Sequence, residues 1–156
     1  MYRYIQTVCK IFYTNWVLII FFLSLFSNII LFYCNNVIEQ DGVSYVAIST
    51  RIDEGIFYHP DYSYFPPLYP YFIFLIHKIV PDLETAARVV SIIFGAMTVL
   101  VLIAISKNLN YRKFTTIFLS FLFIFNFHLS NYSAKVMSET TWIFFNVLGW
   151  FILLKG

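Results

Sequence analysis

Long apolar runs separated by short polar segments dominate the chain. The first run, Ile11–Cys34, is interrupted only by uncharged polar side chains. At about 1.5 Å per residue it measures about 36 Å, against a hydrocarbon core of about 30 Å. Three further runs follow at about 86–105, 114–132 and 140–154. The pattern predicts an all-α integral membrane protein with four transmembrane helices.

One apolar run is too short to cross a bilayer. A helix over Pro67–Val80 would measure about 21 Å, so we expect it to lie in or dip into the membrane interface. The whole segment 35–85 then forms one outer loop, which is too long for a simple connection.

This loop has a second predicted helix before the short apolar run. Asp41, Tyr45, Ile48 and Ile52 recur at helical spacing, and Gly55 stands where such a helix would end. The outer loop is therefore expected to carry two juxtamembrane helices.

The charged residues set the predicted topology. With four spans, one side of the membrane holds six basic residues and no acid: Arg3, Lys10, Lys107, Arg112, Lys113 and Lys155. The other side holds all eight acids: Glu39, Asp41, Asp53, Glu54, Asp61, Asp82, Glu84 and Glu139. By the positive-inside rule both termini are cytoplasmic, which suits a multi-pass protein of the plasma or inner membrane.

Composition excludes several other classes. Hydrophobic residues make up 60% of the 156-residue chain and charged residues 12%, about half the charged share of a typical soluble domain. The net charge of +2 is too small for a nucleic-acid binder, and two cysteines are too few for a disulfide framework. Nucleotide loops, catalytic Ser-His-Asp patterns and cysteine metal motifs are not found in the sequence.

Two carboxylates on the predicted outer side are candidate reactive groups. Asp41 begins the first juxtamembrane helix, where it would serve either as an N-cap or as a reactive carboxylate. Glu139 begins the fourth span, where Ser138 would cap the helix and the acid would suit the helix dipole. Because the topology brings both acids to one membrane face, they are expected to flank one reaction centre.

Other polar residues are weaker candidates. Arg88, at the outer end of the second span, would bind a phosphate or extend to the interface as a snorkelling arginine. His59 and Asp61 would bind a substrate or a metal, but the His-Pro-Asp turn lacks metal-ligand spacing, so no metal site is predicted.

The order of these features resembles the amino-terminal part of the GT-C type polyprenyl-phosphate-sugar glycosyltransferases. The nearest group is the bacterial protein-mannosyltransferase-like family, which includes the aminoarabinose transferase of lipid A. The residues that carry the resemblance are Asp41-Gly-Val-Ser-Tyr45, Pro66-Pro-Leu-Tyr-Pro70, Ala86-Ala-Arg88-Val-Val-Ser91 with Gly95, and Val136-Met-Ser-Glu139. Two details differ from the family pattern: Gly42 stands where many relatives have a second acid, and Phe65-Pro66 where some have a base.

The resemblance implies a partial GT-C fold over residues 1–156 and transfer of a sugar from a polyprenyl-phosphate donor to a lipid, glycan or protein on the outer face. Asp41 is then the general base on the acceptor hydroxyl, and Glu139, Arg88, Tyr45 and His59 are substrate-binding residues. The expected partners are membrane lipid and the lipid-linked donor, with no nucleic acid and no metal or other cofactor.

Length leaves a second interpretation open. Enzymes of this family have roughly ten or more spans, so the resemblance implies an amino-terminal fragment whose remainder would be a further partner. The alternative is a small non-catalytic four-span protein, such as a flippase component for a lipid carrier or an assembly partner. Six or more apolar spans encoded after Gly156 would favour the enzyme, and unrelated genes there would favour the alternative.

Overall fold

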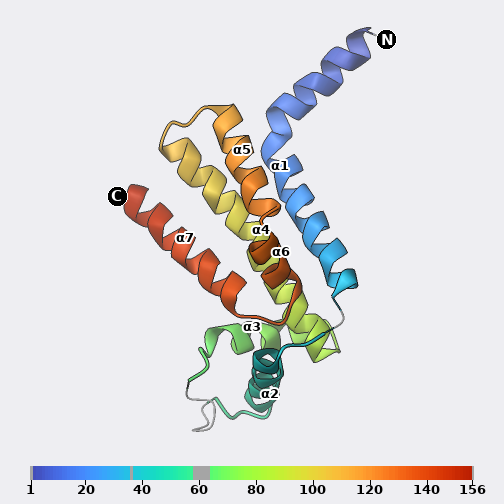
Figure 1. The fold of residues 1–156 in the computed structure, drawn as a ribbon, viewed down its shortest axis with the longest axis vertical. Coiled ribbons are helices and arrows are strands. Elements are labelled where there is room, and N and C mark those ends of the chain that lie inside the picture. The colour runs from blue at the N-terminus through green and yellow to red at the C-terminus, as the bar shows by residue number, and fades with distance from the viewer. Residues whose placement is uncertain (1, 36, 58–63, 156) are drawn as a thin grey trace.

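The computed structural model describes residues 2–35, 37–57 and 64–155, and only the backbone of residues 2–14. The regular elements of the described part are all helices (Figure 1). Its helices are α1 (Tyr2–Cys34), α2 (Gln40–Asp53), α3 (Leu68–His77), α4 (Leu83–Asn108), α5 (Lys113–Ile124), α6 (Phe127–Ala134) and α7 (Glu139–Lys155). This confirms the predicted all-α class.

Two helices of the described chain are long and apolar enough to cross a membrane. They are α4 and the part of α1 over Asn15–Cys34, which begins at a break where Asn15 has φ −107° and ψ 18°. The pair α5 and α6 gives a third span if the bent pair is taken as one. Helix α7 matches the predicted fourth run in its bounds, but its 17 residues fall short of the usual spanning length. The described chain therefore has two or three candidate spans, which indicates a membrane protein.

The prediction of one continuous helix over 114–132 is wrong. The axes of α5 and α6 meet at 59°. The Oδ1 atom of Asn126 accepts a hydrogen bond from the Leu129 amide at 3.1 Å, and the Ser130 hydroxyl donates to the Ile124 carbonyl at 2.5 Å. These side chains compete with the helical backbone for its own hydrogen bonds, and so they end α5 and start α6.

Helices α1, α4 and α6 pack closely around one small residue. A Cβ atom added to Gly95 would lie 3.0 Å from Ser133 Cβ and 3.2 Å from Asn28 Nδ2. Such small residues let helices approach closely inside a membrane. This contact fixes α6, and the chain that leads from it to α7, against the two longest helices.

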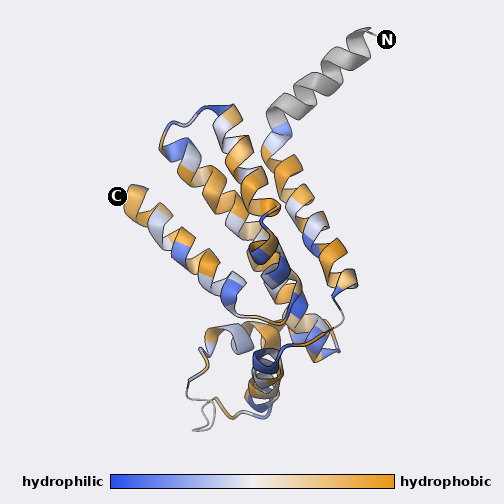
Figure 2. Ribbon diagram, in the orientation of Figure 1, coloured by the Kyte–Doolittle hydropathy of each residue, from blue (hydrophilic) through white to orange (hydrophobic). Residues whose placement is uncertain are grey.

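Charged residues separate to the two ends of the bundle. At one end the Nζ atoms of Lys107 and Lys113 lie 5.2 and 5.7 Å from the centroid of the Trp16 ring. At the other end Lys135 forms an ion pair with Glu39. Figure 2 shows mostly apolar residues along α1, α4, α5 and α7, and more hydrophilic residues in α2 and in the loop between α4 and α5.

The two short helices between α1 and α4 gather at the end of the bundle that carries Glu39 (Figure 1). Helix α2 ends as predicted, with Gly55 at φ +85° and the Ile56 amide donating to the Arg51 carbonyl at 2.8 Å. Helix α3 has 10 residues, about 15 Å, so it is too short to cross a bilayer. Both helices that the sequence predicts between the first and second apolar runs are present.

Candidate functional site

A proline-rich turn begins α3 and positions a buried tyrosine. Pro70 lies in the first turn of the helix, where a missing amide hydrogen costs no internal hydrogen bond. Tyr69 beside it is 1% exposed. Its hydroxyl lies 3.1 Å from the Ala87 carbonyl oxygen and 2.9 Å from Ser91 Oγ. Burial raises the pKa of the Tyr69 hydroxyl well above its ordinary value, so this residue is a neutral tie between α3 and α4.

A second tyrosine joins α2 to the start of α7. The Tyr45 hydroxyl lies 2.7 Å from Ser138 Oγ, and its ring packs edge-on against Tyr69 with centroids 5.1 Å apart. Burial raises the pKa of the Tyr45 hydroxyl; the Ser138 hydrogen bond opposes this, and the carboxylates of Glu139 and Asp41 raise it further. Both acids therefore act electrostatically on the same hydroxyl.

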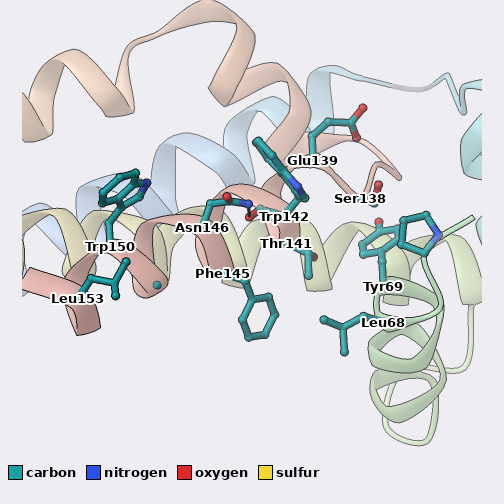
Figure 3. A pocket seen from close by; sticks show the side chains of 12 residues that line it. Leu68, Tyr69, Ser138, Glu139, Thr141, Trp142, Phe145, Asn146, Trp150 and Leu153 are labelled. Carbon is teal, nitrogen blue, oxygen red and sulfur yellow. Dashed lines mark hydrogen bonds between the residues drawn. The ribbon is translucent and has the colours of Figure 1, made fainter.

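Beside these tyrosines a groove of about 630 Å³ runs along one face of α7 (Figure 3). Its polar end is at Ser138 and Glu139, and its other end is at Leu153. Two buried polar atoms at the polar end, Glu139 Oε2 and Thr141 Oγ1, have no hydrogen-bond partner among the described residues. The lining residues are Pro66, Leu68, Tyr69, Ser138, Glu139, Thr141, Trp142, Phe145, Asn146, Gly149, Trp150 and Leu153.

Asp41 lies outside the lining of this groove. It is exposed in the first turn of α2, while Glu39 is the N-cap residue and makes no side-chain capping hydrogen bond. Asp41 is therefore not the N-cap that the sequence allowed. A carboxylate there is favoured by the helix dipole and remains accessible to a substrate.

Gly42 explains how α2 comes so close to the start of α7. A Cβ atom at this position would lie 2.8 Å from the carbonyl oxygen of Val136, two residues before Ser138. A larger residue would push α2 away from that backbone. The glycine after Asp41 is thus required by the packing of α2 against the chain that leads into α7.

We expect Gly42→Ala to destabilise the protein by about 1–3 kcal/mol, because the methyl group overlaps backbone that cannot rotate away. Gly149→Ala is the matched control, since a Cβ there meets no atom within 4 Å in the part of the chain that the structure describes, and alanine favours the helix by about 0.5–1 kcal/mol. Thermal unfolding in detergent micelles measures both. Equal melting temperatures for Gly42→Ala and the parent would contradict this account.

Arg88 is buried, with 5% of its surface exposed. Its guanidinium forms an ion pair with Glu84 and donates to the backbone carbonyl of Asn35, and it lies 5.6 Å from the Phe32 ring centroid. It ties α4 to the end of α1. The snorkelling interpretation is wrong, because the side chain is neither extended to solvent nor exposed.

Two sequence candidates, and the predicted absence of a metal site, remain to be compared with the structure. His59 and Asp61 lie outside the described residues. Within the described ranges, no cluster of three or more histidine, cysteine or acidic side chains is arranged to hold a metal ion. Sequence reasoning missed Thr141, Trp142 and Asn146, although their spacing along α7 places them on the face that begins with Ser138.

Comparisons with known protein families, with curated proteins and with solved structures find no match to this chain.

Proposed function

We propose that the protein is a membrane glycosyltransferase, or the amino-terminal part of one, that acts on the outer face of the plasma or inner membrane. The sugar comes from a polyprenyl-phosphate donor and passes to a hydroxyl of a lipid, glycan or protein acceptor. The observation that carries the proposal is the pairing of two carboxylates with a groove. Glu139 lines the polar end of an apolar groove suited to a lipid-borne substrate, and Asp41, outside that lining, acts with Glu139 electrostatically on the Tyr45 hydroxyl.

Asp41 is the proposed general base. Its exposed carboxylate accepts the proton of the acceptor hydroxyl while that oxygen attacks the anomeric carbon. The bond from the anomeric carbon to the phosphate oxygen breaks, and polyprenyl phosphate leaves with the electron pair. Exposure suits this role, because the acceptor must reach the carboxylate from outside.

A four-span topology with both termini in the cytoplasm is part of the proposal. It is supported by contacts at the end of the bundle that carries Lys107 and Lys113, where the Asn108 side-chain amide donates to the Leu154 carbonyl at 2.9 Å. Helix α7 therefore reaches from the Glu139 end to the lysine end. A helix of this length, about 26 Å, is accommodated by modest local thinning of the bilayer.

Oriented membrane vesicles that contain the protein test this function. The donors are undecaprenyl-phosphate-linked pentoses and hexoses carrying radioactive sugars, supplied to right-side-out vesicles. We expect label to appear in a lipid, glycan or protein acceptor, with none transferred from nucleotide sugars and little in inside-out vesicles. Failure of every lipid-linked donor, or transfer directly from a nucleotide sugar, would overturn the proposal.

A further inference from the structure

We infer that the groove along α7 holds a lipid whose head group is uncharged and rich in hydroxyls, and that it excludes the phosphate of the donor. The identification of this lipid as the acceptor rests on the proposed transferase function. Its binding in the groove is argued from the charges, unpartnered polar atoms and shape of the groove itself.

The charge of the groove argues against a phosphate. Among the described residues that line it, Glu139 is the one charged side chain, and it is acidic. Three cations of the outer face are already paired: Arg88 with Glu84, Lys135 with Glu39, and Lys78 with Asp53. A phosphate placed at the polar end would meet a carboxylate of the same sign, without a lining cation to offset the repulsion.

The polar end instead matches hydroxyl groups. Glu139 is a strong acceptor of hydrogen bonds from hydroxyls, and one of its oxygens is buried without a partner. Thr141 is 3% exposed, lines the same groove and also has an unpartnered oxygen. Buried polar atoms are normally paired, so two unpaired ones at one end of a cavity indicate a polar ligand.

Aromatic and amide side chains extend this match. Figure 3 shows Trp142 beside Glu139, followed along the helix by Asn146. The Trp142 side chain is 66% exposed, so its indole ring is open to a ligand. A flat ring beside a carboxylate and an amide accommodates a polyol or sugar head group, which has both apolar C–H faces and hydroxyls.

The other end of the groove suits an apolar chain. From Glu139 to Leu153 the helix rises about 21 Å, and the lining after Asn146 consists of Gly149, Trp150 and Leu153. Gly149 leaves open space, because a Cβ there would have no heavy atom of the described residues within 4 Å. A single chain running along α7 past Gly149 would place its head group at Glu139.

Tryptophan fluorescence gives a direct test, because two of the three tryptophans, Trp142 and Trp150, line the groove. The Trp16→Phe variant leaves only these two indoles to report. It is reconstituted in phosphatidylcholine bilayers with small mole fractions of a chain-brominated dodecyl glucoside, or of the matching brominated dodecyl phosphate. Bromine quenches an indole on contact, and a true site gives quenching that saturates.

We expect the glucoside to saturate at a mole fraction at least about tenfold below that of the phosphate, and Glu139→Gln to remove most of this difference. Gly149→Leu should raise the saturating fraction of the glucoside about tenfold by filling the groove. Ile152→Phe adds bulk to an exposed position of α7 outside the groove and should change nothing.

Equal or tighter binding of the phosphate would overturn the inference. So would quenching by the glucoside that rises in proportion to mole fraction without saturation, since that would mean contact with ordinary bilayer lipid. Quenching measures binding without transfer. A negative result here therefore leaves the transferase assay standing, and an inactive protein leaves the binding result standing.

Discussion

Replacing Asp41 by asparagine is expected to lower sugar transfer by at least about a hundredfold, because general-base catalysis contributes about 10²–10⁴ in rate. Asparagine keeps the size and hydrogen-bonding capacity of the side chain but cannot take the acceptor proton. Since Asp41 is exposed, the variant should fold and insert normally, with stability changed by no more than about 1 kcal/mol from the lost helix-dipole interaction. Initial transfer rates from the lipid-linked donor, with melting temperature alongside, measure both effects.

Asp53→Asn is the matched control for this variant. Asp53 is an exposed aspartate on the same helix, at the opposite end from Asp41, and it pairs with Lys78. Its substitution removes the same charge from α2 and should leave transfer nearly unchanged. Equal rates for Asp41→Asn and the parent would rule out the assignment of the base, and an equal loss in both variants would indicate a general effect of charge on this face.

Features with a local physical cause were predicted well. Helix α2 follows from the spacing of Tyr45 and Ile52, both buried in the structure, and Gly55 ends it through a positive φ that glycine adopts freely. The short α3 follows from the prolines that precede it and from the limited length of its apolar run. Both features depend on residues within one or two helical turns of each other, so they can be predicted from the local sequence without knowledge of the tertiary structure.

The broken third span shows where run length misleads. Asn126 is uncharged and sits within an apolar stretch, so hydropathy treats 114–132 as continuous. The break arises from hydrogen bonding instead, because the Asn126 side chain caps α6 through the Leu129 amide. An asparagine in an apolar run is consistent with either a continuous or a broken helix, and tertiary packing decides between them.

The candidate site was predicted in part. Charge and topology predict Asp41, Tyr45 and Glu139 on one face, and the structure brings Tyr45 into contact with Ser138, the residue before Glu139. Their roles with substrate stay predictions. The groove could not be predicted from the sequence, because it depends on the approach of α3 to α7. Helical spacing shows which residues lie together on one face of α7, but it does not show which other element lies opposite that face.

Arg88 has two competing interpretations, a ligand of the substrate and a structural residue. We expect Arg88→Met to destabilise the protein by about 2–3 kcal/mol. The variant leaves the Asn35 carbonyl without its charged donor and Glu84 without its partner. This loss of stability is smaller than that expected for breaking a fully buried ion pair, because the Glu84 side chain is 42% exposed and can be hydrated. Melting temperature in detergent micelles, followed by helical circular dichroism, provides the measurement.

Arg88→Lys and a double variant separate the two roles. Lysine keeps the positive charge but cannot reach both Glu84 and the Asn35 carbonyl in the geometry of a guanidinium, so a structural tie predicts that Arg88→Lys is also destabilised. Adding Glu84→Gln to Arg88→Met should recover part of the loss, because the two residues interact directly. A direct ligand of the donor phosphate predicts the opposite pattern: Arg88→Met would melt like the parent and bind the lipid-linked donor more weakly, while Arg88→Lys would keep most of both properties. Arg88 acts as a structural residue if stability falls in both single variants and is partly restored in the double variant.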